Sequence, residues 1–255
     1  MLRIATIDNL SAQAYQLKTP DFPCSLTAQS PSAVYTMAQR EGCAAALLPV
    51  ARIRELAPIY APLGHYGIAC RGAVFSVMLF SESPLEEVLK ARQPIFVTQA
   101  SQTSRQLLYH LCVERYGYAP VWTEEEEESK TRLLIGNDAV NGDRIEQQWP
   151  VQVDLGAWWL ASTGKPFVYA QWVVQKKLDE TVKTQLSTWL EKTVSYSETA
   201  EGVKAMVNAS CALGLDVAMA TEYYAKVSAR IHEEDEQGLA CFFEMQEAGL
   251  CRNIA

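Results

Sequence analysis

Short apolar runs alternate with segments of helical spacing along the first 80 residues. The runs 2–7 (LRIATI) and 44–50 (AAALLPV) are typical of buried strands. Between them, Ser30 can cap a helix and Pro31 fits its first position, and apolar residues follow at helical spacing. This strand–helix–strand order favours an α/β fold, with helices on the faces of a parallel sheet.

Two longer apolar runs, 71–80 (RGAVFSVMLF) and 166–174 (PFVYAQWVV), predict long buried strands. A second α/β pattern lies between them. It comprises a short helix in PLEEVLKA, a strand at 95–98, a helix at 101–117 that ends at a glycine, and a strand at 132–136. The chain after 174 has helical spacing throughout, as far as Phe243.

Because the strand–helix pattern occurs twice, on either side of a long apolar run, we predict two lobes joined by two crossover strands, with a central cleft. The first lobe is expected to comprise 1–80 plus 172–255, and the second lobe 81–171. Clefts at such boundaries are favoured sites for small molecules.

Composition narrows the possible partners. The 255 residues are 49% hydrophobic and 20% charged, with a formal charge of −8, which argues against a nucleic-acid partner. The chain has neither an 18-residue apolar stretch nor a secretion signal, so we expect a cytoplasmic location and no membrane partner. The seven cysteines form no CxxC pair and predict neither a disulfide nor a metal site.

Familiar catalytic motifs are missing. The sequence contains no HExxH, GxSxG, P-loop or GxGxxG, and none of its three histidines has an obvious catalytic setting, so no cofactor is expected. The remaining chemistry lies in hydroxyls and backbone donors. In SQTS (101–104), Thr103 and Ser104 fall at an expected helix start, where a carboxylate or phosphate is favoured. Plain helix capping is the alternative.

Three other segments carry polar residues beside apolar strands. Asn137 and Asp138 follow a strand at its carboxyl end, where α/β sheets bind ligands, although a bare turn would look the same. Ser76 would bury a hydroxyl unless it faces a cleft or finds a backbone partner. Arg71 either offers a fixed charge to an anion or pairs with a surface carboxylate.

Several of these motifs, in order and at compatible spacing, resemble the chorismate dehydratases of the futalosine route to menaquinone. The resemblance extends over most of the first 175 residues, and the segments that carry it are the LRI start, AALLPV, IACRGAVFSVMLFS, SQTS, LLIGNDAV and DLGAWWLASTGKPFVYAQW. It implies a type II periplasmic-binding-protein-like fold used as a cytoplasmic enzyme. It also implies a dicarboxylate substrate, chorismate, which loses water to give 3-[(1-carboxyvinyl)oxy]benzoate.

The resemblance also assigns roles to residues. The family's strand serine falls on Ser76, and its anion-binding Thr/Ser pair falls on Thr103 and Ser104. Ser11 occupies the place of an active-site asparagine, so either Ser11 or nearby Asn9 could supply a hydrogen bond there. Asn137 stands where an aspartate is common and leaves Asp138 as the acid of that pair.

The resulting hypothesis has Ser76 and Ser11 as catalytic residues. They would orient the substrate and assist the leaving hydroxyl, while the enolpyruvyl carboxylate of chorismate itself takes the proton. Asn9, Arg71, Thr103, Ser104, Asn137 and Asp138 are the expected substrate-binding residues. The alternative is a non-catalytic cytoplasmic binding protein for a small aromatic or cyclic carboxylate. The sequence leaves a homodimer open.

Overall fold

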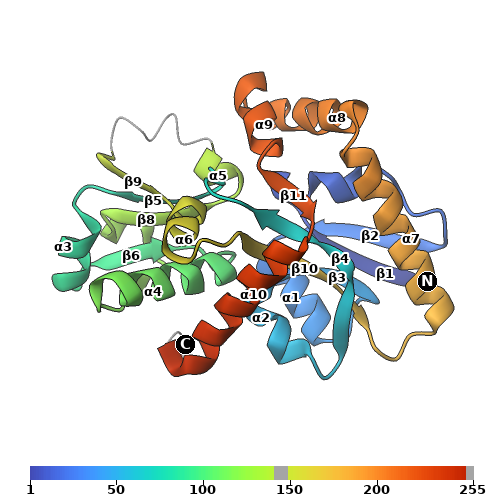
Figure 1. The fold of residues 1–255 in the computed structure, drawn as a ribbon, viewed down its shortest axis with the longest axis horizontal. Coiled ribbons are helices and arrows are strands. Elements are labelled where there is room, and N and C mark those ends of the chain that lie inside the picture. The colour runs from blue at the N-terminus through green and yellow to red at the C-terminus, as the bar shows by residue number, and fades with distance from the viewer. Residues whose placement is uncertain (141–148, 251–255) are drawn as a thin grey trace. The chain divides into compact units, whose positions relative to one another are not determined.

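The computed structural model describes residues 1–140 and 149–250, and the chain forms two compact units (Figure 1). Unit 1 consists of Met1–Ala69 and Val168–His232. Unit 2 consists of Cys70–Phe167 and the segment that begins at Glu233. The boundaries therefore differ from those expected, because residues 70–80 and the C-terminal helix belong to unit 2.

Unit 1 contains a six-stranded sheet in the order β11-β4-β10-β3-β1-β2. Its strands are β1 (Leu2–Ile7), β2 (Cys24–Gln29), β3 (Ala45–Pro49), β4 (Tyr60–Cys70), β10 (Phe167–Gln175) and β11 (Val227–Arg230). Its helices and 3-10 turns are η1 (Leu10–Gln16), α1 (Pro31–Gln39), α2 (Val50–Ile53), η2 (Arg54–Leu56), α7 (Glu180–Ser197), α8 (Ala200–Cys211) and α9 (Val217–Tyr224). β1 pairs in parallel with β2 and β3, whereas β10 runs antiparallel to β3.

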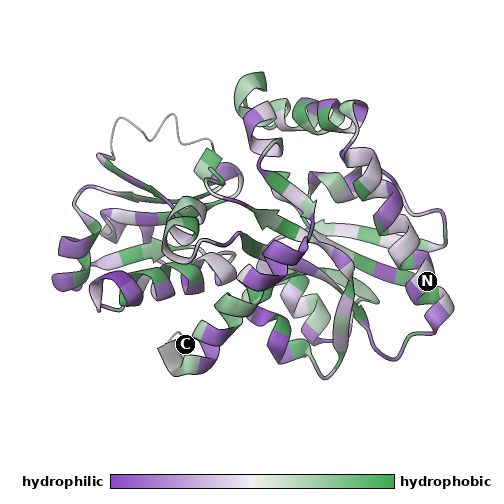
Figure 2. Cartoon of the chain, in the orientation of Figure 1, coloured by the Kyte–Doolittle hydropathy of each residue, from purple (hydrophilic) through white to green (hydrophobic). Residues whose placement is uncertain are grey.

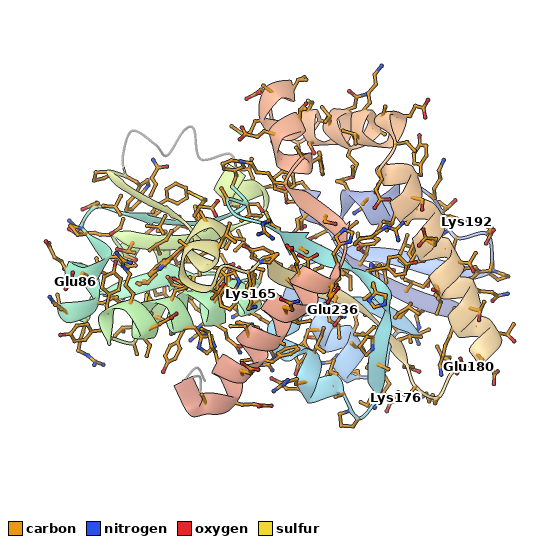
Figure 3. All side chains as sticks on the ribbon, in the orientation of Figure 1. Glu86, Lys165, Lys176, Glu180, Lys192 and Glu236 are labelled. Carbon is orange, nitrogen blue, oxygen red and sulfur yellow. The ribbon has the colours of Figure 1, made fainter. Side chains whose placement is uncertain are left out.

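Local signals set several elements of unit 1. Ser30 Oγ accepts a hydrogen bond from Ala33 N–H, and Pro31 begins α1 as predicted. Trp172 on β10 makes edge-to-face contacts with Tyr15 and Trp189, and all three side chains are fully buried. Figure 2 shows hydrophobic colouring along the strands and mixed colouring on the helices that cover them. Glu180 and Lys192 of α7 form surface ion pairs, with Lys183 and Asp21 respectively (Figure 3).

Unit 2 contains a five-stranded sheet in the order β7-β6-β8-β5-β9. Its strands are β5 (Val77–Ser81), β6 (Pro94–Val97), β7 (Val121–Thr123), β8 (Thr131–Ile135) and β9 (Val151–Asp154). Its helices and turns are α3 (Leu85–Lys90), α4 (Gln102–Tyr116), η3 (Glu126–Glu128), α5 (Asn137–Val140), α6 (Leu155–Thr163), α10 (Glu233–Met245) and η5 (Gln246–Leu250). β6 is parallel to β7 and β8, while β5 is antiparallel to β8 and β9.

Aromatic packing explains why α10 joins unit 2. The Phe242 ring is fully buried, and it meets the rings of Phe167, Trp159 and His110 edge to face. Close backbone packing accompanies these contacts, because a Cβ on Gly238 would lie 2.0 Å from the Pro166 carbonyl oxygen. The expectation that the C-terminal helices all belong to the first lobe is therefore wrong for α10.

Two other expectations about secondary structure are corrected. The run 71–80 is not one strand: residues 71–76 form a loop, and β5 begins only at Val77. Gly72 and Phe75 have φ angles of +95° and +59°, which no strand accommodates. The segment around Val227 is strand β11 rather than helix, because it lies at the edge of the unit 1 sheet beside β4. No helix among the described residues is long and apolar enough to cross a membrane.

Candidate active site

Loops of unit 2 that carry predicted residues lie at one edge of its sheet. β6 and β8 are parallel, so both carboxyl ends, Val97 and Ile135, point to that edge. β5 is antiparallel to β8 and pairs Val77 with Ile135, so it begins there. β9 ends there too, because Asp154 pairs with Met78.

We call this edge the site edge. It comprises the loop 71–76, the loop 98–101 with the first turn of α4 as far as Ser104, the residues 136–138 at the start of α5, and Asp154. It brings six predicted residues to one end of one sheet: Arg71, Ser76, Thr103, Ser104, Asn137 and Asp138. The carboxyl ends of parallel strands are the usual ligand-binding end of α/β sheets.

Ser76 is buried, and its backbone is fixed on both sides. Its N–H donates to Val74 O at 2.7 Å, across a three-residue turn with Phe75 in the middle. Its carbonyl accepts from Gly136 N–H at 2.8 Å, which connects the loop before β5 to the loop after β8. Only 4% of Ser76 is exposed. The sequence predicts Ser76 in the middle of a strand, whereas in the structure Ser76 directly precedes β5.

Asp154 holds the other side of that turn. Its Oδ2 accepts from Val74 N–H at 2.9 Å and from Phe75 N–H at 2.7 Å. Its Oδ1 caps α6 by accepting from Ala157 N–H at 2.9 Å. Burial raises the pKa of this carboxyl, and the backbone N–H donors oppose that rise. One side chain thus connects β9, α6 and the loop that carries Ser76.

Thr103 and Ser104 lie in the first turn of α4, and both are buried. The first α-helical bond joins Arg105 N–H to Ser101 O at 2.8 Å. Ser101 is at the N-cap position, but its side chain makes no cap hydrogen bond and instead lies 3.0 Å from Thr98 Oγ1. Plain capping by Ser101 therefore does not account for the hydroxyl cluster. The first turn of α4 therefore places two buried hydroxyl residues and the amide end of the helix at the site edge.

Two buried oxygens at the site edge are acceptors without a donor. Gln102 Oε1 and Asn137 Oδ1 have no hydrogen-bond partner within the described residues. A buried amide oxygen without a partner is costly, so a ligand hydroxyl or N–H group would be a favourable partner for either oxygen. Asp138 is exposed at the start of α5.

Arg71 pairs with a surface carboxylate, which is one of the two roles that the sequence leaves open. Its guanidinium forms an ion pair with the Glu234 carboxylate at the start of α10, and both side chains are exposed. An exposed pair of this kind contributes little to stability. The charge of Arg71 is therefore already balanced by a carboxylate on the surface of unit 2.

Asn9 and Ser11 belong to unit 1, where they contact each other at the start of η1. Ser11 Oγ donates to Asn9 Oδ1 at 2.5 Å. With this bond made, Asn9 can still donate hydrogen bonds through its side-chain NH₂ group, and Ser11 Oγ can still accept them. Tyr224 OH donates to Leu10 O at 3.1 Å and lies 2.7 Å from Ser210 Oγ, so α9 and α8 also hold η1.

A cavity of about 260 Å³ in unit 1 has Ser11 on its wall. Burial raises the pKa of Tyr224, another of its lining residues, to about 12, so that phenol is neutral near pH 7. The other residues around the cavity are Ala14, Ser197, Glu198, Val203, Met206, Val227, Ser228 and Ala229. The lining mixes hydroxyls and the Glu198 carboxylate with apolar side chains, which suits a small polar organic molecule.

Unit 2 itself provides no histidine base at the site edge. His110 is buried among aromatic rings in unit 2, and burial lowers its pKa to about 4. His65 and His232 lie in unit 1. Within the described ranges, no group of three or more His, Cys, Asp or Glu side chains is placed to hold a metal ion.

Comparison with known proteins identifies the family. The family model described as menaquinone biosynthesis (VitK2_biosynth) matches residues 3–248. The chain belongs to the menaquinone biosynthesis family. This assignment agrees with the resemblance that the motifs carry, and it covers the C-terminal helices that carry few motifs of their own.

Solved structures show that this member of the menaquinone biosynthesis family has the periplasmic-binding-protein fold. Protein AF1704 from Archaeoglobus fulgidus superposes with a TM-score of 0.74 at 16% identity, over 97% of each chain. The Candida albicans CA3427 gene product, described as having the generic periplasmic binding protein fold, gives 0.60 at 10% identity over 96% of this chain and 90% of its own. The aliphatic sulphonate binding protein SsuA from Escherichia coli gives 0.55 at 13% identity, over 96% and 87%. The predicted fold class is confirmed.

Sequence reasoning missed Asp154 and Gln102 as residues of the site edge. Asp154 stands directly before the apolar helix LGAWW, so an N-cap could have been predicted for it. Its contact with Val74 and Phe75, about 80 positions earlier in the chain, has no local signal. Gln102 lies inside the SQTS segment, but its amide has no local signal that sets it apart from its hydroxyl neighbours.

Proposed function

We propose that this protein of menaquinone biosynthesis is a chorismate dehydratase, which removes water from chorismate to give 3-[(1-carboxyvinyl)oxy]benzoate. The observation that carries the proposal is the site edge of unit 2, where the Ser76 loop and the start of α4 occupy the same end of one sheet. The cytoplasmic location, the lack of a cofactor and a homodimer stay predictions from the sequence.

The donor set fits a doubly negative substrate. Chorismate carries two carboxylates, and the chain has a net charge of −8, so binding must come from local donors. The helix start at Thr103 and Ser104 offers hydroxyls, backbone amides and the positive end of the helix dipole. Arg71 is the weaker candidate, because Glu234 already neutralises it. We therefore assign one carboxylate to the start of α4.

The reaction itself needs only a modest base. A proton leaves the ring carbon that bears the enolpyruvyl ether, hydroxide leaves the neighbouring carbon, and the ring becomes aromatic. We assign the base to the enolpyruvyl carboxylate of the substrate, since the histidine of unit 2, His110, is buried among aromatic rings. Ser76 orients the substrate and donates a hydrogen bond to the departing hydroxyl. The proton that the enolpyruvyl carboxylate has taken passes to that hydroxide, which leaves as water. The role expected for Ser11 stays a prediction from the sequence.

Two buried amide oxygens without a hydrogen-bond donor support the binding of a substrate that carries a hydroxyl group. Gln102 Oε1 and Asn137 Oδ1 each need a donor that the described residues do not supply. Chorismate has one free hydroxyl, the group that is lost. A hydrogen bond from that hydroxyl to either oxygen would hold it in place before it leaves.

The second candidate is a non-catalytic protein that binds a small cyclic carboxylate. Its support is the shared fold with SsuA, a periplasmic sulphonate binding protein, and the presence of Ser11 where the resembling enzymes have asparagine. Both candidates need the same anion site. They differ in whether bound chorismate is converted.

Incubating the pure protein with chorismate separates the two candidates. The enzyme gives a product lighter by one water, whereas a binding protein returns chorismate unchanged while binding it. Ser76→Ala should lower kcat by about 100-fold or more. Ser81→Ala is the matched control, since Ser81 lies at the far end of β5 and bonds to Thr131 Oγ1. Full turnover by Ser76→Ala would refute the role given to Ser76.

A further inference from the structure

The loop before β5 adopts a conformation that its own residues disfavour. Phe75 has a φ of +59°, in the left-handed region that a side chain with a Cβ rarely enters. It is the central residue of the three-residue turn closed by Ser76 N–H and Val74 O. Turns of this kind are strained and persist only where surrounding contacts enforce them.

Asp154 supplies those contacts. One carboxylate oxygen accepts from two successive amides, Val74 N–H at 2.9 Å and Phe75 N–H at 2.7 Å. Two successive N–H groups can converge on one oxygen only when the backbone torsions between them, those of Val74, are turned. The bond to Phe75 N–H also fixes the peptide plane whose carbonyl, Val74 O, closes the turn. Hydrogen bonds to a carboxylate are stronger than neutral ones, so they can offset the strain of one residue.

The carboxylate is itself held in place. Its other oxygen caps α6 at Ala157 N–H, and its backbone lies at the end of β9, where Asp154 pairs with Met78 of β5. Asp154 therefore fixes the turn to β9 and to α6. Gly136 N–H holds the Ser76 carbonyl from the opposite side.

We infer that Asp154 is a positioning residue that sets the place of the Ser76 hydroxyl through the Val74–Ser76 turn. It acts on the backbone of the turn rather than on the substrate. The catalytic part of this inference rests on the function proposed above. The structural part, that Asp154 enforces the turn, stands independently of it.

Two variants separate the turn from the helix cap. Asp154→Ser retains a hydroxyl at the N-cap of α6 but provides a single, shorter acceptor, so it keeps the cap and releases the turn. Asp216→Ala is the matched control, because Asp216 caps α9 through Met219 N–H as Asp154 caps α6 through Ala157 N–H. Asp154→Glu keeps both oxygens on a longer side chain and tests for partial rescue.

The first readout is amide hydrogen exchange in the full-length protein. Asp154→Ser should accelerate exchange of the Val74 and Phe75 amides by roughly 10-fold or more, and Asp216→Ala should leave both unchanged. Unchanged exchange in Asp154→Ser would overturn the inference.

The second readout is turnover of chorismate. Asp154→Ser should lower kcat by roughly 10-fold to 100-fold with KM changed less than about 3-fold, because the anion contacts at the start of α4 remain. Asp154→Glu should recover part of kcat. Faster exchange with full kcat would overturn the catalytic part. If the wild-type protein does not convert chorismate but the exchange result holds, the proposed function fails and the positioning of the turn stands.

Discussion

Phe242→Ala tests how α10 is attached to unit 2. The ring is fully buried and packs edge to face against Phe167, His110 and Trp159, at centroid distances of 5.2, 5.6 and 6.3 Å. These contacts come from three other segments of the unit. Removal of the ring should therefore destabilise unit 2 as a whole rather than loosen the chain end alone.

The magnitude follows from burial and from the space left behind. Losing the transfer free energy of a fully buried phenyl group costs about 2–3 kcal/mol. A cavity of roughly 100 Å³, at about 24 cal/mol per Å³, adds about 2 kcal/mol if the neighbours do not collapse into it. The expected loss is thus about 4–5 kcal/mol, near the upper end of the usual range for Phe→Ala.

Urea unfolding followed by tryptophan fluorescence and circular dichroism measures this loss. Phe243→Ala is the matched control, since Phe243 is the next residue of α10 and is only half-buried. We expect it to cost about 1–2 kcal/mol. Equal losses for the two variants, or a loss below about 2 kcal/mol for Phe242→Ala, would refute the packing described for α10.

Two further predictions concern stability. Burial lowers the pKa of His110 from 6.5 in the unfolded chain to about 4, so stability that is complete above pH 6.5 should fall, by up to about 3 kcal/mol, as the pH drops toward 4. Urea unfolding across that range should show a shallower fall for His110→Leu, and identical slopes would contradict this account. Gly67→Ala should cost about 2–3 kcal/mol in the same assay, because its Cβ would lie 2.3 Å from Ala170 O. Gly117→Ala, which meets nothing within 4 Å but has a φ of +75°, should cost about 1 kcal/mol, and an equal loss at both glycines would argue against the close strand contact.

The sequence by itself determined the elements whose signals are local. The run 2–7 became β1, and the Ser30–Pro31 pair began α1, because strand burial and helix capping depend on neighbours a few residues away. Gly117 likewise ended α4 in the left-handed conformation. The motifs also identified the family.

Only the tertiary structure decided features that join distant segments. The residues 227–230 have the apolar spacing of a helix but form β11, because they lie beside β4 at the edge of the sheet. The helix α10 joined unit 2 through rings that lie as far back as His110. The turn at Phe75 exists because a carboxylate 79 residues later accepts its N–H group. A hydrogen bond between such distant residues leaves no periodic trace in the chain, so hydropathy and spacing could not reveal it.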